Sequence, residues 1–288
     1  MTDAQKSTGN SVQRLKICVE AKQILIRNRK VNVPPIIESI RKELEAIPAT
    51  VSEVMEMPFP NEVIEVKILN SKQYLERTDC CCGNSHGIGH YEPASTEFLI
   101  DVETIIKDRY FEDFMSFRKK ARTYILGVAW HEAAHLNHFS YNYDMFIPCH
   151  RAEICNKKPK FTIWDKIYCR IYNWLNKWKM QRNLILKEGI AHWVQDTLLE
   201  KNFGQENVLF FEERGPQIPE IFEKRMNFIY KNIFFWKVGD NFAYAFIESI
   251  KQITGRNPIK LIVDNPPKIR ELYKPSRYVR RLKRENLI

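Results

Sequence analysis

The feature that most restricts how this chain folds is a His-Glu-Ala-Ala-His run within a segment of helical periodicity. Apolar residues from Phe114 to Val128 recur at three- and four-residue spacing, which predicts one long helix that continues into the run. His131 and His135 are four residues apart, so such a helix presents both imidazole rings on one face. The two rings can therefore reach a single tetrahedral zinc ion.

Glu132 lies next to that face, within reach of a water molecule on the same metal. Zinc lowers the pKa of a bound water to about 7, and a neighbouring carboxylate can accept the proton as the water attacks a carbonyl. The motif therefore predicts hydrolytic chemistry with Glu132 as the general base. The alternative is an amphipathic helix whose histidines pack in the core or face water.

A zinc site of this kind needs a third protein ligand. The metzincin arrangement would place His or Asp six residues beyond the second histidine, where this chain has Tyr141. The other known arrangement takes a Glu from a later helix, and Glu188 lies 53 residues beyond His135 in a segment of helical pattern. Small residues accompany both segments and would let the two helices approach closely around a metal: Ala133, Ala134, Gly189 and Ala191.

The two segments together resemble the gluzincin metallopeptidases, the thermolysin-like and aminopeptidase-like group, over roughly residues 90–200. The resemblance implies a zincin-like fold with one catalytic Zn²⁺ bound by His131, His135 and Glu188, and with Glu132 as general base. It also implies that a strand within Tyr91–Val102 pairs with the extended backbone of a peptide or protein substrate. An ordinary core strand is the alternative, and the two interpretations are compatible.

Two departures from the family pattern affect individual roles. Thermolysin-like enzymes carry an Asp four residues after the ligand Glu that orients the first histidine, and this chain has His192 there. His192 is therefore a candidate partner of the ligands, an oxyanion donor or a packed side chain, and Asp196 is the alternative orienting carboxylate. Tyr244 and His192 are our candidate oxyanion donors, with Tyr230 behind them. The Gly-x-Met-Glu-Asn signature of the aminopeptidases is absent from the sequence, so nothing predicts recognition of a free amino terminus.

The pattern along the chain predicts an α+β fold that is mainly α, with a small mixed sheet ahead of the central helix. We expect an edge strand beside this helix and a helical subdomain after it. Strands are predicted at 63–69 and around 98–102, and further helices at 12–27 (ended by Pro34-Pro35), 36–47, 164–178, 184–199, 226–233 and 242–254, with Gly255 as the last C-cap. We expect residues 1–10 to be disordered and 11–288 to form one domain, with N-terminal helices in 11–60, sheet and zinc helix in 61–140 and a helical part in 141–288.

Composition limits the class of protein and the cellular location that we expect. No run approaches the roughly 20 apolar residues of a membrane helix, so an integral membrane protein is not expected. The N-terminus has no apolar signal core, and the odd number of seven cysteines includes the adjacent Cys80, Cys81 and Cys82, which favours a reducing, cytoplasmic location. One hypothesis for this segment is a second zinc site formed by Cys82, His86 and His90. Another is that one of the thiols binds the catalytic zinc and keeps the enzyme latent. A flexible loop at the mouth of the cleft is the simpler interpretation.

The net charge of +10 raises the question of a nucleic-acid partner. The segment Lys268–Ile288 has eight basic and two acidic residues and so carries +6 of this charge. The rest of the chain is barely basic, which argues against nucleic acid. Two alternatives to the peptidase stay open: a catalytically inactive, peptidase-like binding protein, which the intact Glu132 argues against, and a nucleic-acid-binding protein that acts through the basic tail.

Overall fold

The computed structural model of the chain describes residues 14–26, 28–59, 63–82, 89–92, 96–108, 114–142, 163–204, 235–272 and 274–288. Its strands are β1 (Arg14–Val19), β2 (Gln23–Ile26), β3 (Arg29–Asn32), β4 (Val63–Leu69), β5 (Gly89–Glu92) and β6 (Glu97–Asp101). Its helices are α1 (Val33–Glu38), α2 (Arg41–Glu45), α3 (Ile47–Met55), α4 (Ser71–Cys82), α5 (Val102–Asp108), α6 (Phe114–Tyr141), α8 (Ile163–Phe203), α11 (Phe235–Thr254), α12 (Pro258–Asp264), α13 (Ile269–Leu272) and α14 (Pro275–Arg284). The fold is thus α+β and mainly helical, as the sequence predicts.

The N-terminal segment differs from the prediction of a helix over residues 12–27. It forms β1, which pairs in parallel with β4 from Arg14 opposite Val63 to Val19 opposite Ile68, and β2, which forms an antiparallel hairpin with β3. The four-residue spacing of Leu15 and Val19 fits the two-residue period of a strand as well as the period of a helix. Pairing with the distant strand β4 makes this segment a strand, and the sequence pattern does not reveal that pairing.

The next predicted helix, at residues 36–47, is divided among three short helices, α1 to α3. Pro34 and Pro35 lie in the first turn of α1 and do not end an earlier helix. Proline fits this position because the first N–H groups of a helix have no intrahelical acceptor.

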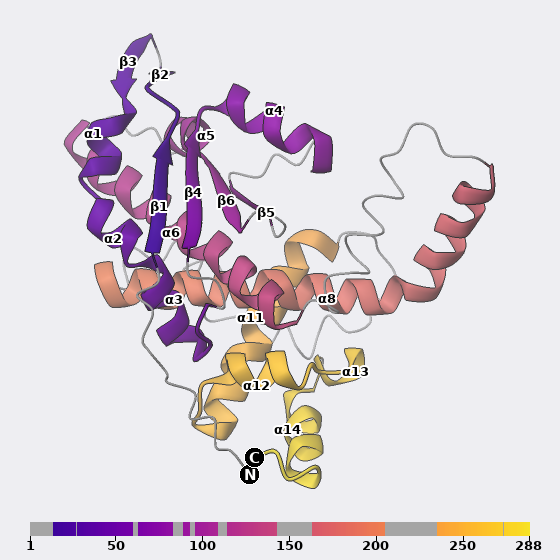
Figure 1. Cartoon of the computed structure of the whole chain (residues 1–288). Helices are drawn as coiled ribbons and strands as arrows, with labels where there is room; N and C mark the ends of the chain where they lie inside the picture. The colour runs from indigo at the N-terminus through magenta and orange to yellow at the C-terminus, as the bar shows by residue number, and fades with distance from the viewer. Residues whose placement is uncertain are drawn as a thin grey trace, which may run out of the picture.

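The four-stranded sheet has the order β1-β4-β6-β5, with β5 antiparallel to β6 at one edge (Figure 1). The predicted strand at 63–69 is confirmed with the same bounds, and the one around 98–102 is confirmed as β6. One face is apolar and joins the main core through Ile64, Val66, Ile68, Phe98 and Ile100. On the other face α4 covers one end, where Tyr74 packs with Leu69 and Leu99.

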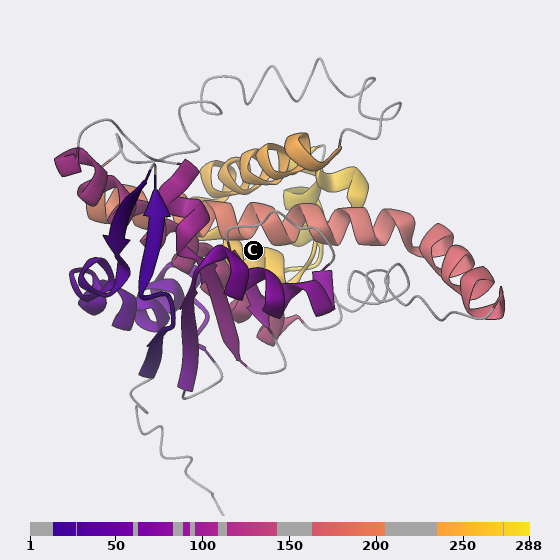
Figure 2. The same ribbon diagram turned by 90° about the horizontal axis from the view of Figure 1, so that it is seen from above.

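Helix α6 lies against β5 and β6 on the apolar face of the sheet, and α8 packs against α6 on one side and α11 on another (Figures 1 and 2). The predicted helices at 164–178 and 184–199 form one 41-residue helix, α8. Its N-terminal part extends away from the rest of the molecule in both views. The C-terminal part of α8 therefore faces the middle of α6.

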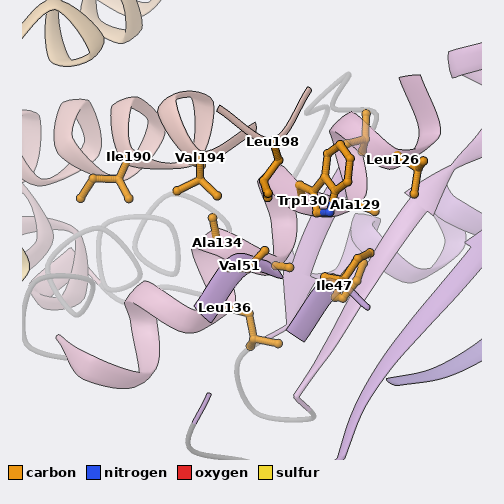
Figure 3. Packing of buried hydrophobic residues seen from close by; sticks show 14 of the residues in the cluster. Ile47, Val51, Leu126, Ala129, Trp130, Ala134, Leu136, Ile190, Val194 and Leu198 are labelled. Carbon is orange, nitrogen blue, oxygen red and sulfur yellow. The ribbon is translucent and has the colours of Figure 1, made fainter. Parts of the chain in front are cut away.

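Apolar side chains of α3, α6 and α8 interlock in the core between these helices (Figure 3). They are Ile47 and Val51 of α3, Leu126, Ala129, Trp130, Ala134 and Leu136 of α6, and Ile190, Val194 and Leu198 of α8. Trp130 directly precedes His131, and Ala134 directly precedes His135. Burial of these two neighbours fixes the rotation of α6 about its axis and so decides where the histidines point.

The C-terminal part packs as α11 to α14. Helix α11 contains the predicted helix at 242–254 and ends at Thr254, and the φ of +64° at the following Gly255 is the left-handed conformation expected at a C-cap. The basic segment is not a free tail, because Tyr278 and Leu282 of α14 are buried and Arg281 pairs with Glu271 at 2.9 Å. The predicted helix at 226–233 lies outside the described residues. Among the described helices, none combines the length and the apolarity that crossing a membrane requires.

Candidate metal centre

Helix α6 presents the three motif residues close to the edge of the sheet. His135 and Glu132 are buried, whereas the side chain of His131 is 13% exposed. The rings of His131 and His135 lie edge to face with their centroids 4.6 Å apart. The face of α6 that carries the imidazoles is therefore enclosed at His135 and more open at His131.

Glu188 reaches both rings from the facing helix α8. Its Oε2 atom lies 3.4 Å from Nε2 of His131 and 3.2 Å from Nε2 of His135. Hydrogen bonds from a nitrogen donor to an oxygen acceptor are normally about 2.7–3.2 Å long. Two ligands of one tetrahedral zinc ion, each about 2.05 Å from the metal, lie about 3.3 Å apart. Both Glu188 distances match the separation expected of two ligands on one zinc ion, and the 3.2 Å contact with His135 also has the length of a direct hydrogen bond.

His192 adds a third imidazole one turn after Glu188 on α8. Its ring centroid is 4.5 Å from that of His131, and donor atoms of His131, Glu188 and His192 lie within 4.8 Å of one another. This second set of donors contains His192 in place of His135. His135 contacts Glu188 directly at 3.2 Å, and His192 lies on the partly exposed side.

The protonation states of the metal-free site suit a cation. Burial would raise the pKa of Glu188, but His135, Lys187 and the contacts with both imidazoles hold that pKa well below its usual range. Burial lowers the pKa of His135 to about 3. Burial also acts to lower the pKa of His131, but its contact with Glu188 and the charge of Glu132 raise it overall. At neutral pH, Glu188 is ionised and His135 neutral, which are the forms that bind metals.

Glu132 lies under the first residue of the edge strand. A Cβ atom added to Gly89 would lie only 2.5 Å from Oε1 of Glu132, so the backbone of β5 passes directly over this carboxylate. Burial, with a smaller contribution from the charge of Glu188, raises the pKa of Glu132 to about 7, although His131 and Lys187 act in the opposite direction. A bound cation would lower this pKa again.

Tyr244 lies on α11, which packs against α8 beside the site, and its side chain is buried. The preceding residue, Ala243, faces Gly189: a Cβ atom on Gly189 would overlap the Cβ of Ala243 and lie 3.1 Å from its backbone. The small residue after Glu188 thus lets α8 approach α11, whereas we expected it to admit α6. The role of Tyr244 as an oxyanion donor stays a prediction.

Two further polar side chains lie buried near the centre of the fold. His138 is fully buried on α6, and burial lowers its pKa to about 3. Asp196 is 2% exposed on α8, two turns after Glu188, and its orienting role stays a prediction. Tyr230 and His86 lie outside the described residues.

Sequence reasoning missed two residues that contact the site. Lys187, which directly precedes Glu188, places its Nζ 3.3 Å from Oε1 of that residue. Gly89 lies against the side chain of Glu132. The only sequence feature that could have pointed to Gly89 is its position in a glycine-containing stretch just before a predicted strand. The Gly89 contact arises from tertiary packing, whereas Lys187 is the neighbour of Glu188 in the chain.

The first part of the cysteine segment is helical. Cys80, Cys81 and Cys82 form the last turn of α4. The second zinc site that we considered for Cys82, His86 and His90 includes a residue outside the described part of the chain, so it stays an expectation, and so does latency through a thiol.

No family model, no curated protein and no solved structure matches this chain. The resemblance to gluzincins therefore depends on the motif residues and on their convergence in space.

Proposed function

We propose that this protein is a zinc-dependent peptidase of gluzincin type, in which His131, His135 and Glu188 bind one Zn²⁺. The observation that carries the proposal is the position of Glu188 Oε2, 3.4 Å and 3.2 Å from the Nε2 atoms of two histidines on another helix. Two imidazoles and one carboxylate are the ligand set of thermolysin-type catalytic zinc, which leaves a coordination position open.

Zinc in such a site supplies a Lewis acid that polarises the substrate carbonyl and acidifies water. Glu132 takes the proton from the attacking water and returns it to the leaving amine. Its buried position beside His131 excludes bulk water from the proton transfer. His192, partly exposed and next to His131, is our first candidate to donate a hydrogen bond to the carbonyl oxygen as negative charge develops there, with Tyr244 as the second.

The substrate we propose is a peptide or protein segment in extended conformation. β5 lies at the edge of the sheet, antiparallel to β6 and directly beside α6. The outer edge of such a strand offers backbone N–H and C=O groups to an extended peptide, largely independent of its sequence.

The test separates metal binding from chemistry. Metal analysis of the purified protein is expected to give one zinc per chain, and Glu188→Ala to lose it. Glu132→Gln is expected to retain zinc but to cleave fluorescein-labelled casein at least about 100-fold more slowly than wild type, because the carboxylate that accepts the proton is gone. Wild type that binds no zinc, or Glu132→Gln that cleaves casein at the wild-type rate, would contradict the proposal.

The same assays address the two alternatives. An inactive, peptidase-like binding protein would retain zinc but fail to cleave casein in the wild-type form. A nucleic-acid-binding protein would bind DNA or RNA with an affinity that falls steeply with salt. Because α14 is folded against the body through Tyr278 and Leu282, this second alternative is tested with charge reversal at the exposed Arg277 and Arg280 and not by deletion of the segment.

A further inference from the structure

We propose that the edge strand β5 sets the position of the Glu132 carboxylate and that Tyr74 is the positioning residue that fixes this strand. The inference rests on the proposed function for its kinetic consequence, and it names two residues, Gly89 and Tyr74, with no part in the zinc-binding motif.

The first step is the contact between Gly89 and Glu132. Gly89 pairs with Ile100 of β6, and the side chain of Ile100 belongs to the core on the α6 face of the sheet. A side chain at residue 89 would point to the same face, because directly opposite residues of an antiparallel pair share a face. There an added Cβ would lie 2.5 Å from Oε1, 2.7 Å from Cγ and 2.9 Å from Cδ of Glu132. The glycine backbone therefore forms one wall of the space that holds this carboxylate.

The second step concerns the side chain that holds the backbone of Gly89 in place. The hydroxyl of Tyr74 donates a hydrogen bond to the carbonyl oxygen of Gly89 at 2.8 Å. Tyr74 reaches this carbonyl from α4, and its ring is buried in the small cluster with Leu69 and Leu99. β5 has only four residues and, among the described strands, pairs with β6 alone, so a hydrogen bond at its first residue adds a substantial share of its attachment.

The third step is that α4 itself is fixed to the sheet. The hydroxyl of Ser71, its first residue, bonds to Oδ1 of the buried Asp101 at 3.1 Å, and the backbone N–H of Ser71 bonds to Oε2 of Glu103, also at 3.1 Å. Asp101 ends β6, the strand that pairs with β5. Tyr74 thus holds Gly89 from a support tied to the same sheet, and small shifts of β5 relative to α6 are restrained.

These contacts predict how a substitution at Gly89 or Tyr74 affects catalysis. Misplacement of a reacting group by about 1 Å can cost about 100-fold in rate. Gly89→Ala is expected to displace the Glu132 carboxylate and to lower kcat on fluorescein-labelled casein about 100-fold. Tyr74→Phe removes one hydrogen bond while the ring stays in place, and we expect a loss in kcat of about tenfold. Both variants are expected to retain one zinc per chain, because neither residue is among the proposed metal ligands.

Tyr278→Phe is the matched control for Tyr74→Phe. Tyr278 is also buried and also donates its hydroxyl to backbone carbonyls, those of Leu261 at 3.1 Å and Asn265 at 3.0 Å, but it lies on α14. A loss of stability alone would affect kcat similarly in the two tyrosine variants. The inference expects kcat to fall in Tyr74→Phe only.

Crystal structures of wild type and Gly89→Ala give a readout that does not depend on activity. A displaced Glu132 carboxylate supports the inference, and an undisplaced one overturns it, even if wild type proves not to cleave casein and the proposed function fails. For an active wild type, kcat values of Gly89→Ala and Tyr74→Phe that equal the wild-type value would also overturn it. If Gly89→Ala does not fold, the comparison of Tyr74→Phe with Tyr278→Phe decides.

Discussion

At the residue scale, ionisable side chains are concentrated where α6 meets α8. Glu132, His135 and His138 on α6 are buried, and the partly buried Glu188 faces them from α8. Burial of a charge without compensation is expensive, so each group either shifts its pKa or finds an opposite charge. Glu188 stays ionised beside the imidazoles and Lys187, whereas His135 and His138 stay neutral. This part of the core is therefore sensitive to acid.

His138 gives a prediction for the pH dependence of stability in the metal-free protein. Its pKa falls from 6.5 in the unfolded chain to about 3 in the fold because of burial. Between these values the unfolded chain binds a proton that the folded chain does not, so stability is complete above pH 6.5 and falls as the pH drops towards 3. Each such histidine contributes a slope of about 1.4 kcal/mol per pH unit.

Urea unfolding of zinc-free wild type and His138→Gln between pH 6.5 and 4.5 measures this slope. The variant is expected to lose stability on acidification less steeply, by about one proton. His135 keeps contributing in both proteins, so the slope does not fall to zero. Parallel pH profiles of the two proteins would contradict the assignment of a buried, neutral His138.

At the element scale, the site depends on how closely three helices approach. α6 supplies the histidines, α8 supplies Glu188, and α11 packs against α8 through the contact of Gly189 with Ala243. Because Gly189 directly follows Glu188, whatever moves α8 away from α11 also moves the ligand. The spacing between α8 and α11 is thus a condition for the spacing between Glu188 and the imidazoles.

Gly189→Ala tests this condition. The added methyl group would overlap the Cβ of Ala243 and forces the helices apart, so we expect a loss of about 1–3 kcal/mol in the free energy of unfolding and weaker zinc binding. The double variant Gly189→Ala with Ala243→Gly moves the methyl group from one helix to the other. It is expected to recover part of both losses, since only the 3.1 Å backbone contacts remain tight. Urea unfolding and zinc titration measure both effects. A double variant that is less stable than Gly189→Ala by the full cost of Ala243→Gly alone would show that the two sites are independent.

At the scale of the whole molecule, the sequence predicts elements whose pattern is local and fails where a distant partner decides. The strand Val63–Leu69 is predicted with its bounds, because β-branched residues alternate after two prolines. Residues 14–19 carry a pattern that fits both a helix and a strand, and pairing with β4, about fifty residues away, makes them a strand. The long helix α8 is predicted as two pieces because its polar residues near the middle interrupt the apolar pattern.

The candidate site follows the same rule. His131, Glu132 and His135 can be identified from spacing alone, and Glu188 from the chemical need for a third ligand. The positioning roles of Gly89 and Tyr74 could not be predicted from the sequence. A glycine does not contribute to a hydrophobic pattern, and a single tyrosine hydroxyl has many possible partners. Chemistry restricts ligands to few residue types, whereas the residues that position them are chosen by packing.

The whole fold should respond to the metal, because the proposed ligands join its two central helices. A ligand that binds only the folded state stabilises it by about 4 kcal/mol at a free concentration 1,000 times its Kd. For a chain of this size we expect a rise in Tm of roughly 8 °C with zinc at that concentration. Glu188→Ala is expected to lose this increment, and Glu132→Gln, which keeps all three ligands, is expected to retain it. Differential scanning calorimetry with zinc, with a chelator and with magnesium measures the effect. A Tm that is the same with zinc and with chelator would mean that α6 and α8 are held together by packing alone and that the three side chains bind no zinc ion.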